Sequence, residues 1–188
     1  RVDLQSFNFT SERLSFAKPP LDMVLANNSL YLLFSGEVKR LDAEGKSILQ
    51  EIAIQGIFST QLHYSETDRR FYLLSGRDLL LMSETGQYEL VDLDKQPASV
   101  LGALGGGQVF LARGKKLWLY DLNTRSVISS SDIELGGEVE WINSGPGSQI
   151  VIAQKNPNFL LKGDRASLTN MQRQGLEGTP ELLKTATF

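Results

Sequence analysis

Few residues of this chain have types and spacings that could support catalysis. The single histidine, His63, could act as a general base or a metal ligand if a nucleophile or further ligands lay beside it. No nucleophile motif of the G-x-S-x-G type accompanies it. His63 lies within the strand-like stretch Gln61–Tyr64. We therefore interpret it as an ordinary strand residue.

Two short stretches place carboxylates two residues apart, and a strand would present each pair on one face. These stretches are Asp132-Ile133-Glu134 and Glu138-Val139-Glu140. Two opposed carboxylates at a set separation are the machinery of glycosidases, so a glycan hydrolase is an alternative function. Because charged residues are mostly exposed, we interpret both pairs as solvated strand edges. The chain is accordingly predicted not to be an enzyme.

Chemistry that depends on a bound metal or phosphate lacks its motifs here. The chain has no cysteine, which excludes disulfides and cysteine-ligated zinc, and it has no D-x-D-x-D-G calcium loop. Gly102–Gly107 is glycine-rich, but a phosphate-binding loop would open a helix, and here a strand-like sequence follows. We predict an inter-strand turn at Gly102–Gly107, and no cofactor or metal.

Overall charge and hydropathy exclude two classes of partner. The net charge of −3 over 188 residues argues against nucleic-acid binding. The longest apolar runs, Leu30–Phe34 and Leu79–Met82, are far shorter than the roughly 20 residues of a membrane helix, so direct membrane insertion is not expected. The cysteine-free chain opens on Arg1, which favours a processed protein of the bacterial cell envelope or periplasm without fixing the compartment.

The chain contains an internal sequence repeat of about 40 residues, which determines where the remaining candidate binding residues lie. An apolar strand, a tight turn and a second apolar strand recur four times, with strand-like stretches before and after each pair. Gly36, Gly76 and Gly114 mark the turns at spacings of 40 and 38 residues, and Asn156 follows 42 residues later. Glycine and asparagine tolerate the positive φ that such turns require. Each unit is therefore predicted to form four short antiparallel strands in about 40 residues, as in a propeller blade.

The predicted fold is all-β: a β-propeller of about four to five four-stranded blades, or part of a larger propeller. A β-sandwich or an open barrel is the alternative. One domain is expected over 1–188, with blade units at approximately 20–54, 55–95, 96–135 and 136–175 and closing segments at 1–19 and 176–188. The stretch Val2–Phe9 is predicted to pair with the fourth unit, whose last strand, Ser167–Met171, is weak. The short segment Pro180–Thr185 is the best helix candidate and is too short to predict as one.

Two sequences resemble known propeller repeats. Leu41-Asp42-Ala43-Glu44-Gly45-Lys46 resembles the turn of PQQ-type repeats, and Leu117–Thr124 resembles the strand and turn that end WD40-like repeats. The tryptophan that ends PQQ-type repeats is absent after Lys46, and Tyr120-Asp121 stands in place of Trp-Asp. The resemblance implies a propeller that docks other proteins, with no specific family and no bound cofactor.

The turns between the second and third strands of each unit should all lie on one face of such a ring. They carry four basic residues, Arg77, Lys115, Lys116 and Lys155, against Glu37 and Asp78. We predict a binding face that meets an acidic segment of a protein partner. Trp141 is a candidate aromatic anchor, whereas Trp118 is expected in the core. The predicted function is a non-enzymatic protein-binding or scaffold module of a larger assembly; an accessory domain that completes another propeller is the further alternative.

Overall fold

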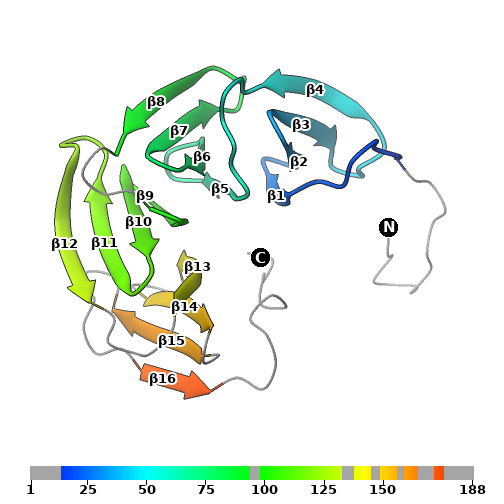
Figure 1. Ribbon diagram of the computed structural model, residues 1–188. Coiled ribbons are helices and arrows are strands. Elements are labelled where there is room, and N and C mark those ends of the chain that lie inside the picture. Colours follow the sequence, from blue (N-terminus) through cyan, green and yellow to red (C-terminus); the bar gives the residue numbers. More distant parts are fainter. Residues whose placement is uncertain are drawn as a thin grey trace.

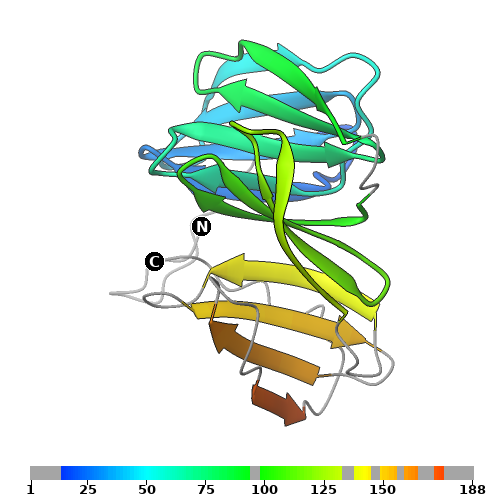
Figure 2. The same ribbon diagram turned by 90° about the vertical axis from the view of Figure 1, so that its left-hand side faces the viewer.

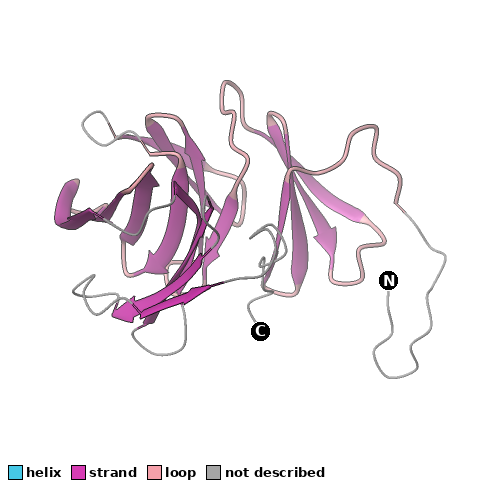
Figure 3. Cartoon of the chain, turned by 60° about the horizontal axis from the view of Figure 1, so that its bottom comes forward, coloured by secondary structure: helices cyan, strands magenta, loops and turns pink. Residues whose placement is uncertain are grey.

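The computed structural model describes residues 14–93, 98–132, 138–144, 149–155, 159–164 and 172–175. The described residues form sixteen β-strands and no helix, as Figure 3 shows. None of them belongs to a helix that is long and apolar enough to cross a membrane.

The strands form four separate four-stranded antiparallel sheets, each made of consecutive strands. Blade 1 contains β1 (Asp22–Ala26), β2 (Ser29–Phe34), β3 (Glu37–Asp42) and β4 (Ile48–Ala53). Blade 2 contains β5 (Leu62–Ser65), β6 (Arg70–Ser75), β7 (Asp78–Ser83) and β8 (Tyr88–Asp92). Blade 3 contains β9 (Val100–Gly105), β10 (Gln108–Arg113), β11 (Lys116–Asp121) and β12 (Ser126–Asp132). Blade 4 contains β13 (Glu138–Ser144), β14 (Gln149–Lys155), β15 (Phe159–Asp164) and β16 (Gln172–Gly175).

The four blades follow one another around a common centre. The first strand of each blade lies innermost, and β1, β5, β9 and β13 contact one another in that order. Figure 1 shows an arc that stays open between blade 1 and blade 4, and Figure 2 shows the same arc from the side, with blade 4 at the bottom. The chain is therefore an all-β propeller arc of four blades, which confirms the predicted fold class.

The core consists of the layers between neighbouring blades. Blades 1 and 2 share one cluster of buried side chains, blades 2 and 3 a second, and blades 3 and 4 a third. Alternate residues of a strand face opposite sides of its sheet. In β6, for example, Leu73 packs toward blade 1 and Tyr72 toward blade 3. This explains why the middle strands are apolar at nearly every position rather than at every second one.

The structure corrects the predicted alignment of the turns by one residue. Phe34, Ser75 and Arg113 each precede a two-residue loop, so these positions are equivalent. Gly36 is therefore the second residue of its loop, whereas Gly76 and Gly114 are the first residues of theirs. All three have positive φ, of 83°, 61° and 59°. Either loop position can demand glycine, so spacing between glycines alone does not define the repeat.

Three predicted segments lie outside the described residues: Val2–Phe9, Ser167–Met171 and Pro180–Thr185. The fourth strand of blade 4 is β16, which begins at Gln172 and pairs with β15. Trp118, predicted to be a core residue, is half-buried and packs against the cluster between blades 2 and 3.

Candidate functional site: the two rims of the propeller arc

One rim of the arc carries the hairpins that join the second and third strands of each blade. Blade 2 presents Arg77 in its hairpin loop, and blade 3 presents Lys115 in its own, between Arg113 and Lys116 at the strand ends. All four side chains are exposed. We call these four residues the hairpin patch, and Arg113 is the member that the sequence analysis missed.

Acidic residues lie next to the hairpin patch: Asp78 follows Arg77 in the chain, and Asp132 lies opposite Lys116 in the strand register. Within the described ranges, Arg77, Arg113, Lys115 and Lys116 form no ion pair. The corresponding hairpin of blade 1 differs, because its Glu37 pairs with a neighbouring lysine at 3.4 Å. The positive charge of this rim is therefore concentrated on blades 2 and 3.

The other two predicted binding residues lie in blade 4 and do not join the hairpin patch. Lys155 forms an ion pair with Glu140 of the adjacent strand β13. Trp141 lies on that innermost strand, opposite Ala153, and is half-buried. The loop that follows Lys155, with Asn156, lies outside the described residues.

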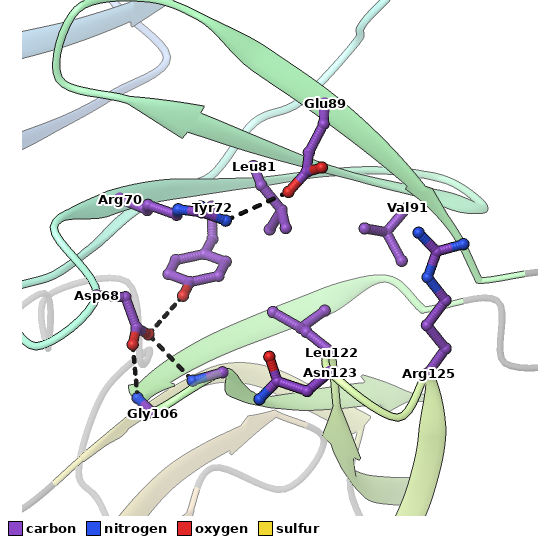
Figure 4. Close-up of a pocket in the computed structure, with 11 residues that line it drawn as sticks. Asp68, Arg70, Tyr72, Leu81, Glu89, Val91, Gly106, Leu122, Asn123 and Arg125 are labelled. Atoms are coloured by element: carbon purple, nitrogen blue, oxygen red, sulfur yellow. Dashed lines mark hydrogen bonds and ion pairs between the residues drawn. The ribbon is translucent and has the colours of Figure 1, made fainter.

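The opposite rim contains a polar clasp between blades 2 and 3 (Figure 4). Asp68, in the turn between β5 and β6, accepts hydrogen bonds from the backbone N–H groups of Gly106 (2.8 Å) and Gly107 (3.3 Å). The buried Tyr72 donates its hydroxyl to the same carboxylate at 2.6 Å, and Ser65 donates at 3.1 Å. One carboxylate thus joins the turn of blade 3 to the strands of blade 2.

The clasp shifts the protonation of both its acidic groups. Partial burial raises the pKa of Asp68, but the four hydrogen bonds that it accepts outweigh burial and leave its pKa below the ordinary value of 3.8. Burial, together with the hydrogen bond to Asp68, raises the pKa of Tyr72. Asp68 is therefore ionised and Tyr72 protonated at neutral pH, which suits a structural anion rather than an acid–base pair.

Glycine is required in the turn that binds Asp68. Gly105, Gly106 and Gly107 all have positive φ, which leaves successive N–H groups free to point at one anion. A Cβ at Gly107 would also lie 2.5 Å from the side-chain nitrogen of Asn123. The predicted inter-strand turn at Gly102–Gly107 is too long, because Gly102–Gly105 belong to β9 and only Gly106 and Gly107 form the turn. The anion that this turn binds belongs to the protein itself.

A second polar cluster links blade 1 to blade 2 on this rim. Tyr64 donates its hydroxyl to Glu84 at 2.6 Å, and the Asn27 side chain donates to both residues. Arg69 pairs with the same glutamate at 3.1 Å. Burial, followed by the bond to Glu84, raises the pKa of Tyr64 to about 12. The hydrogen bond from Tyr64, followed by those from Arg69, lowers the pKa of Glu84.

A groove of about 430 Å³ opens beside the Asp68 clasp, between blades 2 and 3. Its apolar floor comes from Leu81, Val91 and Leu122. Figure 4 shows the charged side chains around it: Arg70 pairs with Glu89 at 3.2 Å, and Arg125 is exposed. Two acidic and two basic residues therefore line this groove.

The candidate catalytic residues that the structure describes lie on three different strands, β5, β12 and β13. His63 is half-buried in the inner strand β5, opposite Tyr72. Glu138 is exposed, and Glu140 is paired with Lys155. Across the described ranges, no three His, Cys, Asp or Glu residues gather as a metal site would require. The other predicted carboxylate pair is Asp132 and Glu134, and Glu134 lies outside the described residues.

Comparison with known proteins supports the fold and does not identify a family. No family model and no curated protein matches the chain. Among solved structures, the WD40 domain of Neurospora crassa Pan2 aligns with 87% of this chain at 13% identity, with a TM-score of 0.65. A streptogramin B lyase aligns with 93% at 15% identity and a TM-score of 0.69, and U3-55K aligns with 88% at 9% identity and a TM-score of 0.69.

The chain spans 52–60% of the length of these three structures. They include both a lyase and a WD40 domain, so the shared fold does not separate enzymes from binding proteins. The resemblance to WD40-like and PQQ-type blades is thus confirmed at the level of architecture: the chain is a β-propeller, and no specific family is identified.

Proposed function

We propose that this chain is a non-enzymatic protein-binding module whose hairpin patch holds an acidic segment of a partner protein. The observation that supports this function best is the gathering of four exposed cations on two neighbouring hairpins. They occur in a chain whose net charge is −3, so the patch is a local departure from an acidic surface.

The fold gives this patch a fixed shape. Each hairpin is anchored by strands whose apolar residues are buried on both sides, as in β7 and β10. Cations held on such supports lose little further backbone freedom when a partner binds. The carboxylates of a partner protein could accept two hydrogen bonds from an arginine of the patch, whereas a lysine would attract them as a point charge.

An acidic probe tests this function directly. We expect a synthetic peptide of about ten glutamates to bind the chain, and the double variant K115E/K116E to weaken binding by about tenfold or more. The matched control is K46E/R125E, which changes the net charge equally, because both residues are exposed in turns of the opposite rim. Fluorescence anisotropy at about 50 mM and about 200 mM salt measures both affinity and screening.

The control variant should bind nearly as tightly as the unaltered chain, and affinity should fall with added salt. Equal loss in both double variants would show that only net charge matters and would remove the hairpin patch as a site. Binding that ignores both the variants and the salt would also contradict this function.

A further inference from the structure

Blade 1 has an apolar face that no other described blade covers. Leu32, Phe34 and Leu41 are buried on the side of the sheet that faces away from blade 2, and Phe16 packs against them. Around this small cluster, Leu21, Met23, Leu25 and Ile48 are 44%, 65%, 66% and 41% exposed. Register places Met23 opposite Leu32 and Leu25 opposite Leu30, so they share this face.

The repeat shows what this face corresponds to in the other blades. In blades 1, 2 and 3, the second strand has a leucine two residues before its last residue: Leu32, Leu73 and Leu111. The residues that pair with them on the innermost strands are Met23, Leu62 and Leu101. Leu62 packs against blade 1 and is 4% exposed, while Leu101 packs against blade 2 and is 0% exposed. Met23 holds the equivalent position with 65% of its surface in solvent.

A hydrogen bond that recurs between neighbouring blades involves the same position of the innermost strand. The side chain of Asp22 in blade 1 accepts from the N–H of Leu62 in blade 2 at 3.0 Å. The side chain of Gln61 in blade 2 accepts from the N–H of Leu101 in blade 3 at 3.1 Å. Blades 2 and 3 therefore each receive an oxygen from the blade before them, through the backbone N–H at one repeated position.

In blade 1 this N–H belongs to Met23, and no blade precedes it among the described residues. Its bond goes instead to the other carboxylate oxygen of the adjacent Asp22, at 2.9 Å. The connection before the strand fits the same pattern. Phe16 packs on this face, as Ile57 and Ala98 pack in the connections before β5 and β9.

We propose that the outer face of blade 1 is a docking surface for a further four-stranded blade from outside these 188 residues. That blade has an apolar face, and it carries an Asp, Asn, Glu or Gln at the start of its inner strand, aimed at the N–H of Met23. A second copy of this chain fits less well. In blade 4, the blade it would present, Ile142 faces the preceding blade as Leu62 and Leu101 do in theirs. Trp141 therefore holds the position of Asp22 and Gln61, and an indole offers no oxygen.

The chain contains its own probe, because blade 2 already carries such an oxygen. A second copy of residues 59–93 fused ahead of residue 14, in place of residues 1–13, would present its Gln61 to Met23. Oxidation by hydrogen peroxide reports burial: Met23 should react readily in the unfused chain, whereas Met82, which is 0% exposed, is the internal reference. In the fused chain we expect oxidation of Met23 to slow by about tenfold.

Two variants separate the parts of this proposal. Gln61→Met in the added copy alone removes the oxygen at similar volume, and should lower the Tm of the fused chain while keeping Met23 protected. Leu25→Glu should leave the Tm of the unfused chain unchanged and restore rapid oxidation of Met23 in the fused one. Met23 that stays reactive in a folded fusion would overturn the proposal. Slow oxidation of Met23 in the unfused chain would also overturn the proposal. It would show that the face is already covered, by a second copy if sedimentation gives twice the mass of the chain, or by the chain itself if Leu25→Glu lowers the Tm.

Discussion

At the scale of single residues, the charged groups of this chain divide into those that hold the arc together and those that are free to meet a partner. Asp68 belongs to the first kind, because all its hydrogen bonds are to groups of blades 2 and 3. Lys115 and Lys116 belong to the second kind. The partial burial of Asp68 is thus explained by its bridging role between the two blades.

Asp68→Asn should destabilise the chain at neutral pH by about 1–2 kcal/mol. Oδ1 of Asp68 accepts from Gly106 and Oδ2 accepts from Gly107 and Tyr72, whereas asparagine has one uncharged acceptor oxygen and would turn an NH2 group toward one of these donors. Solvent screening limits the effect, since Asp68 is only partly buried. Urea unfolding at pH 7 measures the difference. Glu66→Gln is the matched control, since Glu66 is exposed in the same turn.

The same variant carries a pH signature with a definite sign. The folded state holds the pKa of Asp68 below 3.8. The contribution of ionised Asp68 to the free energy of unfolding is therefore complete above pH 3.8, and it is lost as the pH falls through the lower pKa of the folded state. The stability gap between Asp68→Asn and the unaltered chain should narrow only below about pH 4. A gap that narrows between pH 5 and 7 would place the responsible titration elsewhere.

At the scale of the blade, the junction between blades 3 and 4 is built differently from the other two. Blade 3 has Val100 where blades 1 and 2 have Asp22 and Gln61, so no side-chain oxygen is available there. Packing takes its place, with Val100 and Ile142 in one buried cluster. Gly102 allows the close approach, because a Cβ there would lie 2.7 Å from Cγ2 of Ile142 and 3.2 Å from its backbone oxygen.

Gly102→Ala should therefore destabilise the chain by about 1–3 kcal/mol, through overpacking against Ile142. A double-mutant cycle with Ile142→Ala separates this contact from a general intolerance of alanine. The cost of Gly102→Ala should shrink by about half or more when Ile142 is already truncated. Thermal unfolding of the four chains gives the answer, and additive costs would refute the contact as the cause.

The sequence predicted the blades well and their junctions poorly. Short apolar strands joined by glycine turns are local patterns, so the four units could be predicted directly. The glycine-rich stretch Gly102–Gly107 was predicted as a turn throughout, but its first four residues belong to β9. The turn alignment slipped by one because glycine suits either loop position. The Asp68 clasp was missed because its partners lie 38 and 39 residues away. That distance is about one repeat, so a search for polar residues one period from a glycine pair would have found it.

At the scale of the whole molecule, each blade is stabilised chiefly by its neighbours. Blade 2 is packed on both faces, whereas one face of blade 1 is largely open. In such quasi-linear arrays, stability falls toward an uncapped end. Native-state hydrogen exchange should show slower exchange for the amides of β6 and β7 than for those of β2 and β3. Equal protection would indicate that the arc unfolds as one cooperative unit.

The exposed side chains of Met23 and Leu25 also bear on the life of this chain in a cell. A sheet face of this kind is what chaperones recognise and what leads nascent proteins to aggregate. A chain made in excess of whatever covers that face would be retained by chaperones or degraded, since quality control acts on such surfaces continuously. If the proposed covering blade belongs to another protein, the abundance of this chain would follow the supply of that partner rather than its own rate of synthesis.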